Sequence, residues 1–250
     1  MDLTILRNFV YVVTFRTMAL TGLSVLATYL CIKYDLIADM PTALIGLAVV
    51  FPLVFTISAS FERRDKALIQ YGSLNASLAM IFYAHKSWLS AANVDVPLRN
   101  QKVRDIIEEL LALIKQDLTN IQSPASYKTE IYKSFSSLSD YNDEFLARGM
   151  TDSHAILASC LYDAIKSYEC LSTISDYRTP KALRAYSRVF LNLFPILFAP
   201  YFASLSMELF FMGYLIAILY SLVLVMLNNI QDNVENPFDN QGLDDIDLDL

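Results

Sequence analysis

Four long apolar stretches constrain the fold of this chain more than any other feature. A helix needs roughly 20 largely apolar residues to cross the hydrocarbon core of a bilayer. The stretches are residues 9–32 (with 18–32 free of charge), 41–61, 189–207 and 209–228. Since only 18% of the 250 residues are charged and 55% are hydrophobic, we predict an all-α integral membrane protein with four transmembrane helices in two pairs.

Basic residues predict which side of the membrane each segment faces. Sixteen of the nineteen Lys and Arg residues lie from Arg63 to Arg188, and the connections 33–40 and 203–208 contain only Lys33. Because bases are retained on the cytosolic side, we expect a multi-pass protein with both termini in the cytosol. The predicted parts are a first transmembrane pair (1–61), a cytosolic helical domain (62–188), a second pair (189–228) and an acidic cytosolic tail (229–250).

The hydrophilic middle of the chain also has helical patterns. Between residues 98 and 121 apolar side chains recur at three- and four-residue steps, which predicts a helix with one buried stripe. Thr151, Asp152 and Ser153 offer an N-cap for a helix to about residue 174, and Pro124 marks a break before a helix over 127–146. No proline follows the second apolar stretch for more than twenty residues, so we expect its helix to continue unbroken into the cytosol.

Signatures of catalysis or of a zinc site are missing from the sequence. Cys31, Cys160 and Cys170 are an odd number without a paired spacing, and neither His85 nor His154 has ligand-spaced partners. We find no nucleophile elbow, phosphate-binding glycine loop or paired-carboxylate motif. The chain is therefore not expected to be an enzyme or to bind nucleic acid.

A ladder of bulky residues marks the second apolar stretch. Leu47, Phe51 and Phe55 recur every four residues, which stacks them on one helix face, and Pro52 removes a backbone hydrogen bond among them. One interpretation is ordinary packing against lipid or other helices. The other is a hydrophobic neck, in which such side chains from several subunits close a pore by dewetting.

Three runs of this sequence resemble the bestrophin family of pentameric ion channels. They are ALIGLAVVFPLVFTISASFERRDKA, ISDYRTPKALRAYSRVF and ENPFDNQGLDDIDLD, and they occur in the family's order over essentially the whole chain. Where family members usually continue with Trp, Arg64 follows Phe61, Glu62 and Arg63, so the chain is similar to a divergent member. The resemblance implies a homo-pentamer around a central pore that gives passive flow of small ions, most of all anions such as chloride.

The resemblance also assigns residues to the pore. It implies that Leu47, Phe51 and Phe55 form the neck, and it places a second, cytosolic aperture at Lys181, with Ala182 or Leu183 as alternatives. A ring of Lys181 side chains would attract anions. The other interpretation of Lys181 is a base that reaches towards cytosolic headgroups.

The acidic tail has two interpretations. In animal bestrophins, acids directly after an Asn-Pro-Phe run bind calcium, which opens the channel. Here Asn240, Gln241, Gly242 and Leu243 intervene before the pair of acids at 244 and 245, which favours a solvated acidic end. The alternative is that Asn236, Pro237 and Phe238 dock the tail on the cytosolic domain, with Asp244, Asp245 and Asp247 as a calcium clasp. No other cofactor is expected.

A different class of function also fits the four stretches. A non-conducting membrane scaffold would anchor a cytosolic helical domain that binds a partner protein. It does not account for a charge-free second stretch with bulky residues every four positions. A secondary transporter would usually show internal repeats or midplane charges, and Arg16 is the one candidate for such a charge.

Overall fold

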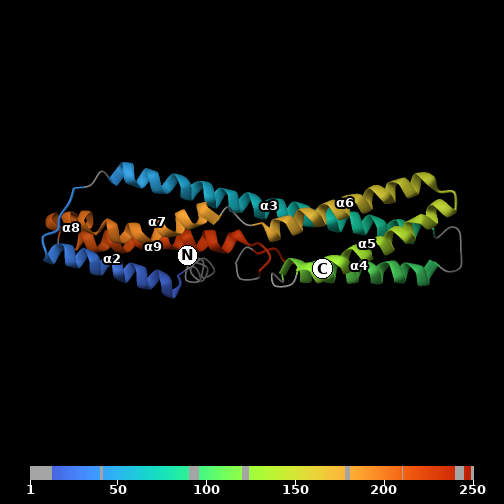
Figure 1. Ribbon diagram of the computed structural model, residues 1–250, viewed down its shortest axis with the longest axis horizontal. Helices are drawn as coiled ribbons and strands as arrows, with labels where there is room; N and C mark the ends of the chain where they lie inside the picture. The colour runs from blue at the N-terminus through green and yellow to red at the C-terminus, as the bar shows by residue number, and fades with distance from the viewer. Residues whose placement is uncertain are drawn as a thin grey trace. The chain divides into compact units, whose positions relative to one another are not determined.

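The chain folds into α-helices joined by short connections (Figure 1). The computed structural model describes residues 13–39, 42–89, 96–119, 124–177, 181–209, 211–239 and 245–248, and these contain no β-strand. The helices are α2 (Phe15–Lys33), α3 (Thr42–Trp88), α4 (Val96–Thr119), α5 (Pro124–Ala147), α6 (Thr151–Asp176), α7 (Lys181–Leu197), α8 (Ala199–Glu208) and α9 (Met212–Glu235). The prediction of an all-α fold is therefore confirmed over the described residues.

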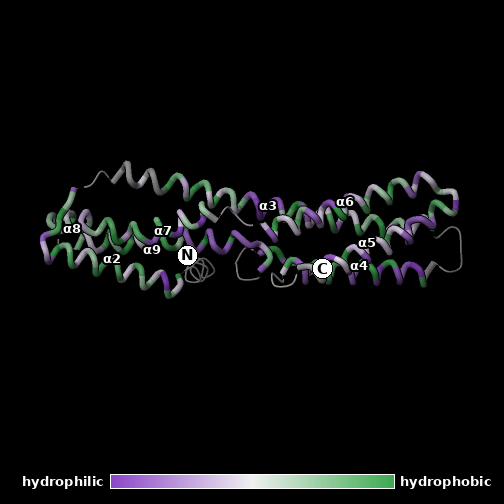
Figure 2. Tube along the Cα trace, in the orientation of Figure 1, coloured by the Kyte–Doolittle hydropathy of each residue, from purple (hydrophilic) through white to green (hydrophobic). Residues whose placement is uncertain are grey.

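Contacts divide the chain into two compact units. The first unit contains α2, α3 as far as Glu62, α7, α8 and α9, and the second contains α3 from Arg63 together with α4, α5, α6 and parts of the C-terminal tail. Helix α3 is continuous over 47 residues, including Pro52, and it extends beyond the second apolar stretch, as the lack of proline after that stretch predicted. Figure 2 shows mainly hydrophobic residues along α2 and α9, whereas α4 and α5 mix hydrophobic with hydrophilic residues.

The first unit has the lengths and composition of a membrane-embedded bundle. In the described part of the chain, three helical segments are long and apolar enough to cross a bilayer, namely Phe15–Lys33, Arg184–Met207 and Met212–Glu235. Helix α9 packs against α2, α7 and α8. These segments are those of an integral membrane protein, and the number of crossings stays a prediction.

The third predicted stretch is not one helix. It divides into α7 and α8 at Phe198, because Pro200 lacks the N–H that a continuing helix would need and instead starts α8 in its first turn. Helix α8 then extends through Glu208, so residues 203–208, predicted to be a connection, are helical. The turn before α9 falls after Glu208.

Gly213 allows α8 and α9 to approach closely. A Cβ atom at this position would lie 2.0 Å from the carbonyl oxygen of Phe202 and 2.2 Å from Oγ of Ser206. Both contacts are far below van der Waals distance, and one of them is to backbone, which cannot rotate away. Small residues serve this purpose at helix interfaces within membranes.

We predict that Gly213→Ala destabilises the first unit by about 2 kcal/mol or more, through overpacking. Thermal unfolding of the detergent-purified protein, followed by size-exclusion chromatography, measures this loss. Gly22→Ala in α2 is the matched control, because a Cβ there meets nothing within 4 Å. It should leave stability unchanged or raise it slightly, and equal losses in the two variants would contradict the packing argument.

The second unit is a helical bundle with its own apolar core. In α4 the predicted stripe is buried at Val103, Leu110, Ile114 and Leu118, while residue 121 lies outside the described residues. Helix α5 begins at Pro124, three residues before the start predicted at 127. The predicted N-cap of α6 is wrong: Thr151 is the first helical residue, and Met150 precedes it without a side-chain cap.

A buried histidine joins three helices of the second unit. His85 of α3 is fully buried, and its Nε2 lies 2.9 Å from Oδ1 of Asn142, while Nη2 of Arg99 lies 3.2 Å from its Nδ1. A neutral imidazole satisfies both contacts when Nε2 donates and Nδ1 accepts. The pKa of His85 is lowered to about 4, mainly by burial and also by the charge of Arg99, against the opposing effect of the hydrogen bond to Asn142.

This arrangement predicts acid sensitivity of the second unit. A histidine whose folded pKa lies below its unfolded value of about 6.5 contributes stability that is present above pH 6.5 and is lost as the pH falls towards 4. The loss amounts to about 3 kcal/mol for a shift of this size. The free energies of unfolding of the wild type and of His85→Gln, measured between pH 7.5 and 4, should therefore converge as the pH falls. Parallel pH profiles would contradict the prediction.

Candidate functional site

One face of α3 holds the helix in the first unit. Leu53, Thr56 and Ser60 are buried there, and their spacing of three and four residues places them on the same side of the helix. The Thr56 hydroxyl lies 2.8 Å from the carbonyl oxygen of Pro52, to which it donates, and 3.4 Å from Oγ of Ser187 on α7. This side of α3 therefore contacts protein rather than lipid or an aqueous path.

The opposite face of α3 carries the predicted neck residues. Phe51 and Phe55 are 54% and 64% exposed, and their ring centroids lie 6.2 Å apart. Both positions are about half a turn from Leu53 at 100° per residue. Leu47 belongs to the same helix, but its side chain lies outside the described residues. Two large aromatic side chains thus project from the first unit, opposite its packed face.

An aromatic ladder on α7 and α8, which was not predicted from the sequence, packs against the buried face of α3. Neighbouring ring centroids along the ladder are 4.3 to 6.2 Å apart. Its members recur every four residues, at Tyr186, Phe190, Phe194, Phe198 and Phe202. Phe194, Phe198 and Phe202 share a core cluster with Leu53. The ladder therefore packs against α3 on the side opposite Phe51 and Phe55.

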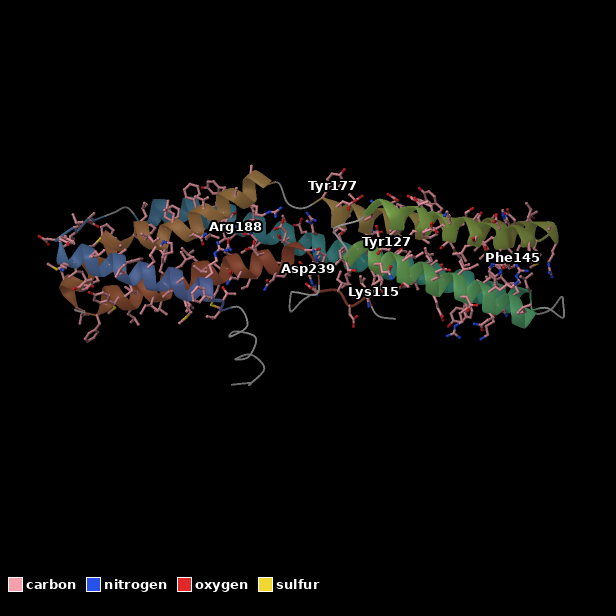
Figure 3. The ribbon with its side chains drawn as sticks, turned by 60° about the horizontal axis from the view of Figure 1, so that its bottom comes forward. Lys115, Tyr127, Phe145, Tyr177, Arg188 and Asp239 are labelled. Carbon is pink, nitrogen blue, oxygen red and sulfur yellow. The ribbon has the colours of Figure 1, made fainter. Side chains whose placement is uncertain are left out.

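Two arginines of α7 have acidic partners on α9. Arg188, labelled in Figure 3, approaches Asp232 at 2.8 Å, and Arg184 approaches the buried Glu235 at 3.0 Å. Arg16 of α2 also lies 3.9 Å from Asp232. Each of these three arginines therefore pairs with an acid within the bundle.

The predicted cytosolic aperture falls at the start of α7. Lys181 is the first residue of this helix, and its side chain lies outside the described residues, as does that of Leu183. Ala182 is exposed. The role of Lys181 as an aperture residue stays a prediction.

The C-terminal tail packs on the second unit. Phe238 is fully buried and Ile246 is 4% exposed, and both belong to the core of that unit. The backbone N–H of Ile246 donates to the carbonyl of Pro237 at 2.8 Å, which closes a loop between them. Asn236 is also buried. A fully solvated tail, the other interpretation, does not describe this segment.

The acids of the tail do not form a calcium site in the described part of the chain. Asp247 is exposed and Asp245 is partly exposed, whereas Asp244 lies outside the described residues. Among the described residues no group of three or more His, Cys, Asp or Glu side chains could hold a metal ion. The calcium clasp therefore stays a prediction, because one of its three acids lies outside the described residues.

Comparison with known proteins identifies the fold. The chain resembles crystal structures of a bacterial bestrophin homologue from Klebsiella pneumoniae, with a TM-score of 0.77, 16% identity, and coverage of 94% of this chain and 92% of that chain. Two variants of that homologue give TM-scores of 0.78 and 0.79 at 16% and 15% identity. No protein-family model and no curated protein matches the chain. At this identity the likeness establishes a bestrophin-like fold.

Proposed function

We propose that this bestrophin-like protein is an ion channel that gives passive transmembrane flow of small ions, with chloride and other anions as the expected permeant ions. The observation that carries the proposal is the two-sided helix α3. One side is fixed to the bundle through Leu53 and Thr56, and the other presents Phe51 and Phe55 without cover in the single chain. A pore needs this combination of a rigid wall and an unoccupied apolar face.

Assembly would bring the exposed faces together. In a homo-pentamer, one α3 from each subunit would surround the axis, and rings of Leu47, Phe51 and Phe55 would form the neck. An ion would lose part of its hydration there, and aromatic edges, which carry partial positive charge, suit anions. Conduction then depends on whether the neck is wide and wet, and Lys181 would add an attractive ring for anions at the cytosolic end.

Bilayer recording of the purified protein under a salt gradient tests conduction and ion sign together. A reversal potential near the chloride equilibrium value supports an anion channel. A value near the cation equilibrium potential keeps the channel and overturns the anion assignment. Silence of both the wild type and the Leu47→Ala, Phe51→Ala, Phe55→Ala variant would overturn the channel in favour of a membrane scaffold.

One observation favours that second candidate function. The second unit has an open cavity of about 390 Å³ between α3 and α4, lined mainly by apolar side chains such as Leu78, Phe82 and Leu111. A scaffold could receive a partner protein on such a surface. It would leave the exposed aromatic face of α3 in the first unit without a role, so conduction is the better-supported function.

A further inference from the structure

Glu62 shares the helix face of the neck residues. It lies eleven residues after Phe51 and seven after Phe55 on the same continuous helix. At about 100° per residue, Phe51 and Phe55 point about 40° apart, and Glu62 points between them, about 20° from each. A rise of 1.5 Å per residue places Glu62 about 10 Å beyond Phe55, towards the predicted cytosol.

The surroundings of Glu62 leave its carboxylate on this face. Glu62 is exposed, and no hydrogen bond or ion pair joins its side chain to the residues that the structure describes. Its neighbours are engaged elsewhere, since Ser60 is buried and donates to the carbonyl of Thr56, and Nη2 of Arg63 lies 2.6 Å from the carbonyl of Ile174. Two turns after an apolar ladder, the same face therefore presents a charge.

We propose that Glu62 is a selectivity determinant that opposes anions and favours cations at the cytosolic end of the neck. The inference rests on the proposed function, because it requires α3 to line the ion path. One carboxylate from each subunit would then surround the path, close enough together for their fields to add. The apolar neck carries no formal charge, so the nearest charged ring has the largest effect on the local concentrations of anions and cations.

This assignment gives Glu62 the opposite effect to that proposed for Lys181. The ratio of chloride to sodium permeability would reflect the balance between the two charges. Removal of the Glu62 charge should therefore move the reversal potential towards chloride, whatever its value in the wild type. The direction of the shift is the test, so it does not depend on which ion dominates in the wild type.

The first experiment compares Glu62→Gln with the wild type in a bilayer under a sodium chloride gradient. The chloride-to-sodium permeability ratio should rise at least about threefold, since several unit charges leave a path only partly screened by salt. Glu62→Lys should raise it further, and Glu62→Asp should keep the wild-type ratio. Glu109→Gln is the matched control, because it removes the same charge from an exposed position on α4 and should cause no shift.

Several outcomes would overturn the inference. An unchanged ratio in Glu62→Gln with currents intact would do so, as would equal shifts in Glu62→Gln and Glu109→Gln. Absence of current from the wild type would instead overturn the proposed function. The two failures are therefore distinguishable.

A chemical test does not depend on comparing separately folded charge variants. Glu62→Cys can be treated during recording with methanethiosulfonate reagents, which form a disulfide with the thiol and release methanesulfinate. A sulfonate-bearing reagent should lower the chloride-to-sodium ratio and an ammonium-bearing reagent should raise it. The wild type, with its own Cys31, Cys160 and Cys170, is treated in parallel. Equal responses of the two proteins would overturn the inference.

Discussion

Replacement of Leu47, Phe51 and Phe55 together by alanine is expected to raise the ion flux of the assembled protein about tenfold or more. Bulky apolar rings oppose entry of a hydrated ion by dewetting, and a barrier lowered by about 1.4 kcal/mol increases a rate about tenfold. Because Phe51 and Phe55 are more than half exposed in the chain, truncating them removes little of the packing within a subunit. The variant should therefore fold and assemble.

Single-channel current in a bilayer, at matched protein density, measures this effect. The matched control truncates Leu23, Leu26 and Leu30, which are exposed apolar residues of α2 in the same unit. This variant loses the same kind of side chain from a helix outside the proposed neck and should keep the wild-type current. Unchanged flux through a well-folded neck variant, or an equal rise in the α2 control, would contradict the pore assignment.

The helices themselves were predictable because apolar runs and periodicity reflect local physics. The buried stripe of α4 follows from the spacing of its apolar residues, and the extension of α3 beyond residue 61 follows from the absence of proline after that residue. The break at Phe198 could also have been predicted. Pro195 and Pro200 both lie in the third apolar stretch. The prediction of a single helix relied instead on the length and hydropathy of that stretch.

The parts that could not be predicted depend on residues far apart in sequence. Arg188 and Asp232 are 44 positions apart, and nothing local identifies them as partners. The burial of Phe238 and Ile246 likewise depends on a core built from four other helical segments. Within the tail itself, the acidic neighbours of these two residues favoured the prediction of a solvent-exposed segment. The aromatic ladder of α7 and α8 did have a sequence signal in its regular four-residue spacing, the same signal that identified the neck residues on α3.

Replacement of Lys181 by glutamate is expected to shift the permeability ratio towards cations by about tenfold. Lys181 begins α7, the helix whose aromatic residues back α3. A ring of ammonium groups there would concentrate anions, and a ring of carboxylates would concentrate cations. The alternative interpretation, a base that contacts headgroups, predicts altered insertion or stability with no change in ion preference.

Reversal potentials under a sodium chloride gradient separate these interpretations of Lys181. Lys102→Glu is the matched control, since Lys102 is exposed on α4 and its replacement makes the same change in charge outside the proposed path. If Lys181 lines the path, its replacement shifts the potential and that of Lys102 does not. If Lys181 and Glu62 act on the same ion in series, their effects on the logarithm of the permeability ratio should add in the double variant Glu62→Gln, Lys181→Gln. An unchanged reversal potential in Lys181→Glu would support the interpretation that Lys181 contacts headgroups. Glu62 would then be the charge that controls selectivity.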